Sequence, residues 1–415
     1  MSTPHPRRRS LLQAAAGLSV PAAALSAADA AAARPRPGAR PVRTLQRDRG
    51  PRTGTYVHSG AGNVLWGHLP NRGTEPVAVV RSGDVVTLDT VSHEGLLEDQ
   101  GKDPLGYFTS FGVAEHDVLG DAVEIAARVA HDGPGPHVVS RPVAVAGAEP
   151  GDVLKVEVLD LALRVPYGVI SNRHGKGALP GELPELWRGD PAVAQYLNVG
   201  GNVSVFTSVA ASGGDLVGVM PGPVSPRFPL APFLGMMGVA RDTSAMVDSV
   251  PPTTAGGNMD VKDLVVGSTL YLPVQVPGAM FFVGDPHMAQ GHGEVALTAM
   301  EGSLRATVRL SVVRPGDGAP LAARDHPFAE TPEHWIPMGL SDPDGPEGGG
   351  NGTDLDEAVR NAVRNAMWFL TEDLGVPGPV AYAYLSAAGD FHVSQVVDRT
   401  VGVHATLRKA DFRAR

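Results

Sequence analysis

The sequence predicts a mainly β protein, a sandwich or barrel assembly of short strands with an α+β lobe at its C-terminal end. Three observations predict it. Of the 415 residues, 51 are Gly and 37 are Pro, which favours tight turns and short strands over long helices. Short apolar runs with alternating patterning recur along the chain, whereas only two segments have clear helical spacing. A chain of this length can also bury a large core.

The first 33 residues are predicted to be a cleavable export signal. Three arginines, Arg7 to Arg9, precede a short apolar run that ends near Leu25, and an Ala-rich stretch follows it. Paired arginines directly before Ser-Leu-Leu are typical of the twin-arginine type, which exports folded proteins, and a plain secretory signal is the alternative. The apolar run is too short to span a membrane. We therefore expect a mature protein that is secreted or periplasmic and has no membrane segment.

Composition and charge narrow the class of protein. Residues 34–55 are rich in Arg and Pro and are predicted to form a disordered linker, which leaves residues 56–415 as one large domain. The formal net charge of −10 argues against nucleic acid or an anionic lipid surface as a partner. The chain contains no Cys, so disulfides and a thiol nucleophile are excluded. It contains no Gly-Xaa-Ser-Xaa-Gly nucleophile elbow either.

Two segments have the same strand-turn-strand pattern. In the first, the apolar runs 77–80 and 85–90 flank Ser82-Gly83-Asp84. In the second, the runs 143–146 and 153–158 flank Pro150-Gly151-Asp152. Gly and Asp are typical turn residues, so each segment is predicted to be a hairpin. The recurrence is a weak signal of related β units, because this turn chemistry is common.

Two helices are predicted. Residues 115–130 place Leu119, Ala122, Val123, Ala126 and Val129 at helical spacing. The second helix begins after Thr353, the predicted N-cap, with acidic residues in its first turn. Its apolar stripe consists of Leu355, Val359, Val363, Met367 and Leu370, and we expect this stripe to pack in the core.

The segment 284–294 has the strongest functional pattern. Asp285, His287, His292 and Glu294 fall within ten residues, between apolar runs at 269–276 and 295–300 that are predicted to be strands. We expect a polar glycine-rich loop that presents these side chains, because imidazole and carboxylate groups are the ligands that divalent metals take. Asp285 and His287 would point to the same side of an extended segment. The alternatives are a structural Asp–His hydrogen bond and a hairpin turn with solvated charges.

Further candidates lie elsewhere in the chain. Gly256, Gly257 and Asn258 precede Asp260, and paired glycine N–H groups can form an anion-binding nest for a substrate while Asp260 joins a metal shell. The alternative is a turn with an Asx cap. His93 belongs to Ser92-His93-Glu94-Gly95, where a turn at Gly95 would let His93 and Glu94 serve one site. His137 follows Pro136, and a lone histidine of this kind is more often a core or surface residue.

The segment 284–294 resembles the GDxHxxQGxGE signature of the acetamidase/formamidase family. Further matches run in order from about residue 56 to residue 408. They include the segments 147–154, 256–260, 270–274, 391–398 and 401–405. One position departs from the pattern, because the family usually carries Asp where this chain has His292. This departure leaves the identity of the amide open.

The resemblance implies that residues 56–415 form a catalytic domain with a β-rich fold. The implied activity is metal-dependent hydrolysis of a small carboxamide, similar to formamide or acetamide, to a carboxylate and ammonia. The divalent cation is expected to be zinc, with calcium as the alternative, and a homo-oligomer is expected. The expected ligands are Asp285 and His287, with His137 and Asp260 as further ligands. Glu294 is expected to be the general base, with His292 as its alternative and His93 as a third catalytic candidate.

Two other functions stay open at this point. A non-catalytic exported protein could use the same polar segment to hold a metal or a small solute. A hydrolase of a different carbon–nitrogen bond could use the same residues. Glu294 discriminates between binder and enzyme, since a binding site does not need an unligated carboxylate beside the metal, whereas hydrolysis needs a base.

Overall fold

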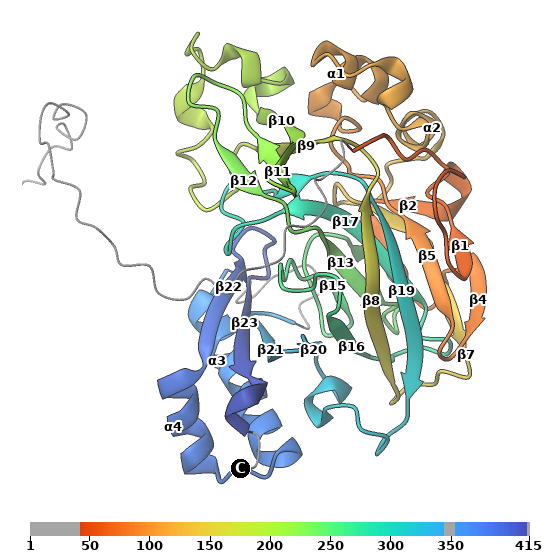
Figure 1. Cartoon of the computed structure of the whole chain (residues 1–415), viewed down its shortest axis with the longest axis vertical. Coiled ribbons are helices and arrows are strands. Elements are labelled where there is room, and N and C mark those ends of the chain that lie inside the picture. The colour runs from red at the N-terminus through yellow and green to blue at the C-terminus, as the bar shows by residue number, and fades with distance from the viewer. Residues whose placement is uncertain (1–41, 344–352, 413–415) are drawn as a thin grey trace, which may run out of the picture. The chain divides into compact units, whose positions relative to one another are not determined.

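The computed structural model describes residues 42–343 and 353–412, all of which belong to one compact unit of the chain. The predicted export signal and residues 34–41 of the predicted linker lie outside the described residues. Two large β-sheets dominate the unit, and the prediction of a mainly β fold is confirmed (Figure 1). Among the described residues, no helix is both long and apolar enough to cross a membrane.

The first sheet, sheet A, has nine strands. In spatial order they are β1 (Thr55–Val57), β5 (Val85–Asp89), β19 (Leu304–Val313), β8 (Val153–Leu163), β16 (Thr269–Pro273), β20 (Phe328–Glu330), β21 (His334–Leu340), β23 (Gly402–Arg408) and β22 (Asp390–Gln395). Neighbouring strands are antiparallel, except that β1 and β5 are parallel.

The second sheet, sheet B, has twelve strands. Its main path is β12 (Arg227–Pro229), β11 (Asp215–Val219), β10 (Val203–Ser212), β9 (Tyr167–Asn172), β18 (Met300–Glu301), β17 (Phe281–Ala289), β13 (Phe233–Val239) and β15 (Gly256–Asn258). Four more strands pair beside β17, namely β2 (Val64–Trp66), β6 (Val138–Ser140), β4 (Ala78–Arg81) and β7 (Val143–Ala146). A separate pair consists of β3 (His68–Leu69) and β14 (Val247–Asp248).

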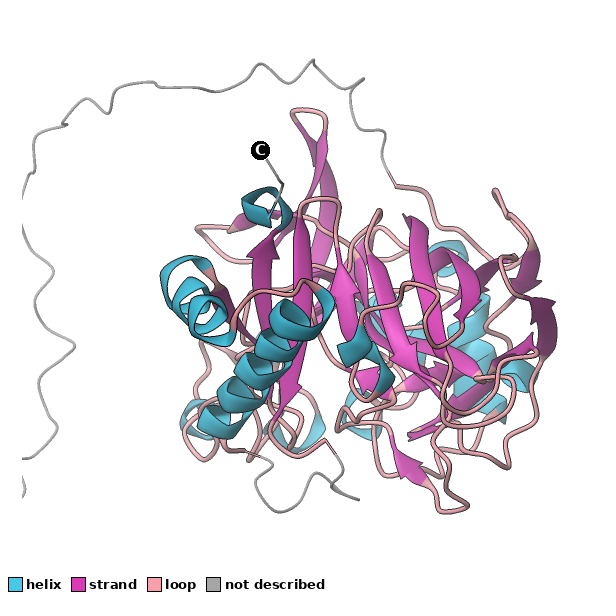
Figure 2. Cartoon of the chain, turned by 90° about the horizontal axis from the view of Figure 1, so that it is seen from below, coloured by secondary structure: helices cyan, strands magenta, loops and turns pink. Residues whose placement is uncertain are grey.

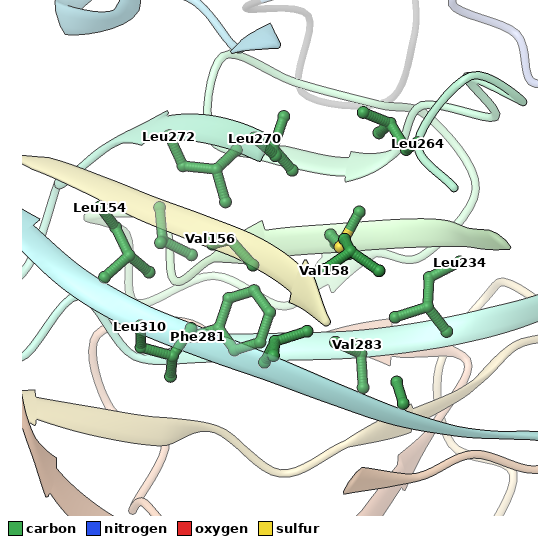
Figure 3. Close-up of a cluster of buried hydrophobic side chains, with 14 of the residues drawn as sticks. Leu154, Val156, Val158, Leu234, Leu264, Leu270, Leu272, Phe281, Val283 and Leu310 are labelled. Carbon is green, nitrogen blue, oxygen red and sulfur yellow. The ribbon is translucent and has the colours of Figure 1, made fainter. Parts of the chain in front are cut away.

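The main core lies between the two sheets (Figure 3). Alternate residues of each strand point into it, because successive side chains of a strand face opposite ways. Sheet A contributes Leu154, Val156, Val158, Leu270, Leu272 and Leu310, and sheet B contributes Leu234, Phe281 and Val283. This packing of one apolar face on another is the predicted sandwich.

The two predicted hairpins are wrong, and the reason is informative. β4 does not pair with β5, and β7 does not pair with β8; in both cases the turn carries the chain from sheet B to sheet A. The two turns have the same hydrogen bonds. Asp84 accepts from the N–H of Arg81 (3.0 Å), and Asp152 accepts from the N–H of Glu149 (2.9 Å). β4 and β7 are parallel neighbours, while β5 and β8 flank β19. The weak repeat signal therefore corresponds to two equivalent crossovers.

The C-terminal lobe combines β20 to β23 with α3 (Leu355–Trp368) and α4 (Gly378–Ala388), as predicted for an α+β lobe (Figures 1 and 2). The N-cap of α3 is Asp354, whose carboxylate accepts from the N–H of Glu357 (3.1 Å), and not Thr353. The buried face of α3 also differs from the predicted stripe, since Leu355 and Val359 are exposed while Ala358, Ala362 and Ala366 are buried. Small side chains are needed here because the backbone of α3 lies directly against Gly339 of β21.

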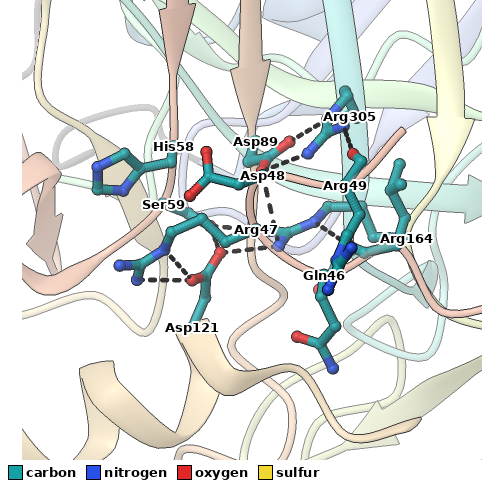
Figure 4. A network of polar contacts seen from close by, with 12 residues as sticks. Gln46, Arg47, Asp48, Arg49, His58, Ser59, Asp89, Asp121, Arg164 and Arg305 are labelled. Atoms are coloured by element: carbon teal, nitrogen blue, oxygen red, sulfur yellow. Dashed lines mark hydrogen bonds and ion pairs between the residues drawn. The ribbon is translucent and has the colours of Figure 1, made fainter. Parts of the chain in front are cut away.

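In the N-terminal half, α2 (Gly120–Arg128) occupies the second part of the predicted helix 115–130, and α1 (Pro104–Ser110) was not predicted. Residues 42–55 differ from the linker that was predicted for them, because they form ordered contacts with this region. Arg164 donates to the carbonyl of Leu45 (3.1 Å) and to Asp121 (2.7 Å), and Arg47 pairs with Asp121 (2.6 Å) (Figure 4). Arg164 and Asp121 are buried, so this network fixes the segment to α2.

Candidate metal and catalytic site

The predicted glycine-rich loop is in large part a strand. Residues 281–289 form β17, which pairs with β13 on one side and with β18 on the other. The second flanking strand begins only at Met300, because residues 295–299 form a turn and a loop. Asp285 and His287 are buried and point to the same side of β17, as the spacing predicted. A strand in the middle of a sheet holds both side chains more rigidly than a loop would.

His287 lies among three carboxylates. Its Nε2 is 2.8 Å from Oδ2 of Asp285, 3.0 Å from Oε1 of Glu301 and 3.9 Å from Oε1 of Glu294. None of these contacts has the alignment of a hydrogen bond. The other ring nitrogen, Nδ1, lies 3.0 Å from Oε1 of Gln290 and is oriented by it. Nε2 is therefore free for a ligand that the carboxylates share.

Asp285 also contacts two further imidazoles. Its Oδ1 lies 3.6 Å from Nε2 of His137 and 3.8 Å from Nδ1 of His93. His137 is oriented by Ser249, whose hydroxyl is 3.0 Å from Nδ1. A hydrogen-bonding partner on the remote ring nitrogen is what metal-binding histidines usually have. The pKa of His137 is lowered to about 4, chiefly by burial, so its imidazole is neutral and can act as a ligand.

Glu94 supports His93 from the opposite side. The two side chains are 3.4 Å apart, and Glu94 is itself bound by Ser171 (2.8 Å) and Arg173 (3.2 Å). Burial opposes the ionisation of Glu94, but Arg173 and His93 outweigh it and hold its pKa well below the usual range. The turn that the sequence analysis required at Gly95 is present, since Gly95 has φ of +87°.

The loop after β17 returns Glu294 to the site. Gly293 pairs with the C-terminal lobe, because its N–H donates to the carbonyl of Ser394 (3.1 Å) and its carbonyl accepts from Val396 (3.2 Å). Glu294, Asp285 and Asp260 have positive φ values of 47°, 47° and 52°. Such conformations cost about 1–3 kcal/mol each in non-glycine residues and gather at functional sites.

Gly235 of β13 leaves the space that these side chains occupy. A Cβ on Gly235 would lie 2.5 Å from Oδ1 of Asp260, 2.6 Å from Cε1 of His287 and 2.7 Å from Oδ2 of Asp285. No other residue type fits at this position without displacing the site.

The residues present fit a divalent cation. Buried polar atoms rarely lack a partner, yet many partnerless atoms of the described residues gather here. They include both ring nitrogens of His93, both carboxylate oxygens of Asp260, Oδ1 of Asp285, Nε2 of His287 and one oxygen each of Glu301 and Asp398. The donor atoms of His93, His137 and Asp285 lie within 4.8 Å of one another, as do those of Asp260, His287 and Glu294, and those of Asp285, His287 and Glu301. Imidazole nitrogens with carboxylates form a donor set that suits zinc better than calcium.

The raised pKa values of the buried carboxyl groups also indicate a site for a cation. Burial and the neighbouring carboxylate of Asp285 raise the pKa of Glu301 to about 7, and burial chiefly raises that of Asp398 to about 7. Burial raises the pKa of Glu294 well above its usual value, and Asp398 and Asp285 add to the effect. Carboxylates this close together repel one another, so the site is short of positive charge.

Most of the predicted site residues meet in this cluster. They are Asp285, His287, His137, Asp260, Glu294 and His93, and Asn258 lies beside them with its Oδ1 buried and without a partner. The predicted nest is different, because the N–H of Gly256 donates to the carbonyl of Thr253 (3.0 Å) and Gly257 pairs with Met237 in the sheet. The N–H of Gly256 is therefore not available to a substrate.

His292 is not part of this cluster. It is exposed, its ring stacks on that of His392 at 4.5 Å, and its donor atoms group with Asp263 and His404. Burial of part of the ring and the neighbouring cation of Lys262 lower its pKa to about 4.

Sequence reasoning missed four residues of the site. Glu301 lies opposite His287 in the β17·β18 ladder, and its only sequence signal was a charge after an apolar run. Asp398 is far away in sequence, and Gln290 was not considered although it orients His287. Gly235 lies in the apolar run 233–239, where nothing in the sequence distinguishes it from other strand glycines.

Known proteins confirm the resemblance. Residues 232–408 match the sequence model of the Acetamidase/Formamidase family, and this range contains Gly235, Asp260, Asp285, His287, Glu294, Glu301 and Asp398. This part of the chain is similar to the acetamidase/formamidase family. His93 and His137, which complete the cluster, come from outside the matched range.

Curated relatives from the acetamidase/formamidase family agree with the match. A formamidase of Methylophilus methylotrophus is 28% identical over 303 residues, which are 63% of this chain and 73% of that protein. An acetamidase of Mycolicibacterium smegmatis is 28% identical over 208 residues, which are 38% of this chain and 49% of that protein. The predicted class, a hydrolase of carbon–nitrogen bonds in linear amides, is thereby confirmed.

Solved acetamidase structures share the fold. That of Yersinia enterocolitica superposes with a TM-score of 0.64 at 24% identity, over 90% of this chain and 96% of its own. That of Bacillus halodurans gives a TM-score of 0.62 at 24% identity, over 86% and 98%. At this identity the likeness concerns the fold.

Proposed function

We propose that the protein is a metal-dependent amidohydrolase that splits a carboxamide into a carboxylate and ammonia. The observation that carries the proposal is the buried group of partnerless imidazole and carboxylate atoms around Asp285 and His287. Groups of this kind are costly to bury without a counter-ion, so a function for them is the simplest explanation of their presence. The relatives named as formamidase and acetamidase supply the reaction class.

The residues that would hold the cation are Asp285, His287, His137 and His93, with Asp260 and Glu301 beside them. We propose zinc, because three imidazoles belong to the set. When bound, such a cation polarises an amide carbonyl and lowers the pKa of water. Asp285 is the most central ligand, since its two oxygens face His287 on one side and His93 and His137 on the other.

Glu294 is the proposed general base. Its Oε1 lies 3.9 Å from His287, at the edge of the ligand group, and its side chain also lines a cavity that opens toward solvent. It can thus receive a proton from the attacking water and deliver it to the departing nitrogen, which leaves poorly unless it is protonated. His292 stays an alternative base that lies further out in the same cavity wall.

Export, maturation and assembly are also proposals. We propose that residues 1–33 direct export by the twin-arginine route and that the mature protein acts outside the cytoplasm, on the basis of the arginine pair and the apolar run alone. We further propose that the protein is a homo-oligomer, as the resemblance implies.

The deciding experiment measures metal and ammonia on the same preparations. The purified protein should contain zinc and release ammonia from at least one member of a panel of small amides. Asp285→Ala and His287→Ala should each lose the metal and the activity together, because each removes a ligand. Asp263→Ala, which removes a carboxylate from the separate group around His292, serves as the matched control and should keep its metal.

Full metal content in both ligand variants would exclude these residues from the metal shell. Tight binding of a solute with no ammonia from any amide would show that the protein is a binder and not an enzyme.

A further inference from the structure

A cavity beside Glu294 bears on the substrate. Its volume is about 410 Å³, and it opens between β9, β12 and the loop that follows β17. Gln290 and Glu294 line it and both approach His287, so these two residues lie between the cavity and the proposed ligand group. A second recess of about 580 Å³ shares Gln290 with it but is lined by Lys262, Asp263 and Glu333 and does not include Glu294.

The cavity is large for a formamide or an acetamide. Taking about 30 Å³ for a molecule the size of water, the four heavy atoms of acetamide fill roughly a quarter of it. Volumes of about 300–1,000 Å³ are typical of pockets that take ligands of drug size. A substrate with only a methyl group or a hydrogen on its carbonyl would leave most of this space to solvent.

The walls of the cavity are mostly apolar, and their polar side chains are those of Gln290, His292, Glu294 and Thr298. Ile170, Phe228 and Met300 form the apolar part together with Val295, Ala296 and Ala299. Two of the polar side chains already form hydrogen bonds within the protein. Thr298 accepts from the N–H of Ser171 (2.8 Å) and donates to the carbonyl of Ala299 (3.0 Å), while the amide of Gln290 donates to the carbonyls of Asp260 and Ser394.

Part of the wall lies outside the range that matches the family. Ile170 and Phe228 lie outside residues 232–408, the range that matches the family, whereas Glu294 lies inside it. Phe228 is held in place over Gly218, where a Cβ would lie 2.6 Å from its ring and 3.1 Å from Sδ of Met300. Phe228 and Met300 therefore converge on one spot and define an apolar side of the cavity.

We propose that the substrate is a primary carboxamide whose acyl group is bulky and apolar, with roughly six to ten carbon atoms. Its acyl chain lies between Phe228, Met300 and Ala296, and its amide group lies next to Glu294. This inference rests on the proposed amide hydrolysis and specifies its substrate class. An apolar group gains free energy when it leaves water for such a wall, and a differential gain in the transition state raises kcat/KM.

The test measures ammonia release by the zinc-loaded full chain from a ladder of amides. We expect kcat/KM for hexanamide and phenylacetamide to exceed that for acetamide at least about 10-fold, since a single apolar contact of this kind discriminates about 10- to 200-fold. 6-Hydroxyhexanamide, which has the same length and a polar end, should fall below hexanamide. N-Hexylacetamide, which places the chain on the nitrogen, should be a poor substrate. Its hydrolysis yields hexylamine and acetate instead of ammonia, so it is followed by the release of hexylamine.

Two variants of the wall and one control test whether the preference for long acyl chains depends on this cavity. Ala296→Phe fills the cavity and Phe228→Ala removes part of its wall, so each should lower the ratio of kcat/KM between hexanamide and acetamide about 10-fold. Val79→Phe introduces the same side chain at an exposed position of β4 and should leave that ratio unchanged. Zinc content is measured for each variant, so that a change in selectivity is separated from damage to the metal site. Phe228→Ala keeps the test open if Ala296→Phe does not fold.

Release of ammonia from formamide and acetamide, with no gain along the ladder, would overturn this inference and leave amide hydrolysis intact. A preference for N-hexylacetamide would overturn the placement of the chain on the acyl side. No ammonia from any amide would overturn the proposed function, and this inference with it.

Discussion

Gly235 lies against His287: a Cβ on this glycine would come within 2.6 Å of Cε1 of the imidazole. The two residues are on the neighbouring strands β13 and β17, and the position without a side chain on one strand accommodates the ligand group of the other. The site therefore depends on the missing side chain at Gly235 of β13 as much as on the ligand residues of β17.

Gly235→Ala should consequently disable the site. The added methyl would push His287 and Asp285 apart, and a displacement on the order of 1 Å typically costs about 100-fold in rate. We expect lower zinc content, ammonia release reduced at least about 100-fold, and a loss of stability of about 1–3 kcal/mol from overpacking. Gly62→Ala is the control, because a Cβ at Gly62 meets no atom within 4 Å. Normal zinc content and normal turnover in Gly235→Ala would show that Gly235 does not lie against the ring of His287 as closely as described.

Glu294→Gln tests the base. The amide keeps the shape of the side chain and cannot take a proton, so ammonia release should fall roughly 10²–10⁴-fold while zinc content is unchanged. Glu333→Gln, on the surface, makes the same chemical change and should have no effect. Retained turnover would move the role to His292, which His292→Asn then tests. Loss of zinc would instead make Glu294 a ligand.

Asp121→Asn tests the buried network of Figure 4. Burial opposes the ionisation of Asp121, but Arg164 and the hydroxyl of Ser59 outweigh it and hold its pKa below the usual value near 4. A carboxylate with a lowered pKa in the folded state stabilises that state above the unfolded-state pKa, and this contribution is lost as the pH falls. We expect the substitution to cost about 3–5 kcal/mol at pH 7, because it removes the nearest carboxylate partner of the buried Arg164.

The stability difference between parent and Asp121→Asn should therefore shrink as the pH is lowered through about 4 toward 2, in urea unfolding followed across that range. Asp242→Asn removes an exposed pair with Arg72 and should cost under about 1 kcal/mol at any pH. An equal difference at pH 7 and at pH 3 would show that the charge of Asp121 does not matter.

The predicted export signal is tested by Arg8→Lys together with Arg9→Lys. These changes keep the charge and should leave a folded, unprocessed precursor in the cytoplasm if the twin-arginine route is used. Fractionation followed by mass measurement of the N-terminus reads out the result. Normal export and cleavage would assign the segment to the plain secretory route.

Sequence reasoning found the parts of the site that local spacing determines. Asp285 and His287 share a side because a strand has a period of two, and this holds whether the segment is a loop edge or, as here, a central strand. Glu301 and Asp398 could not be found in this way. They reach the site only through the pairing of β17 with β18 and the docking of the C-terminal lobe, which are long-range events with no local pattern.

In the fold, too, local sequence patterns predicted some features, whereas long-range pairing decided others. Short strands and a sandwich follow from alternation and turn residues, and both are present. Whether a strand-turn-strand segment closes as a hairpin or crosses between sheets is decided by which neighbours complete each ladder, as β19 does for β5 and β8. The predicted stripe of the second helix is confirmed only in part. Val363, Met367 and Leu370 pack in the C-terminal core, whereas Leu355 and Val359 are exposed because contact with Gly339 selects the narrow alanine face there.

The network around Arg164 also limits how short the mature chain can be. Leu45 exchanges hydrogen bonds with Arg164, Gln46 binds Val118 and Gly120 at the start of α2, and Arg47 pairs with Asp121. A peptidase that cuts before Thr44 leaves these bonds intact, whereas a cut after Arg49 would remove Arg47 and the carbonyl of Leu45, which bind the buried side chains of Asp121 and Arg164. We therefore expect a chain that begins at Thr44 to keep this network, and a chain that begins after Arg49 to be less stable.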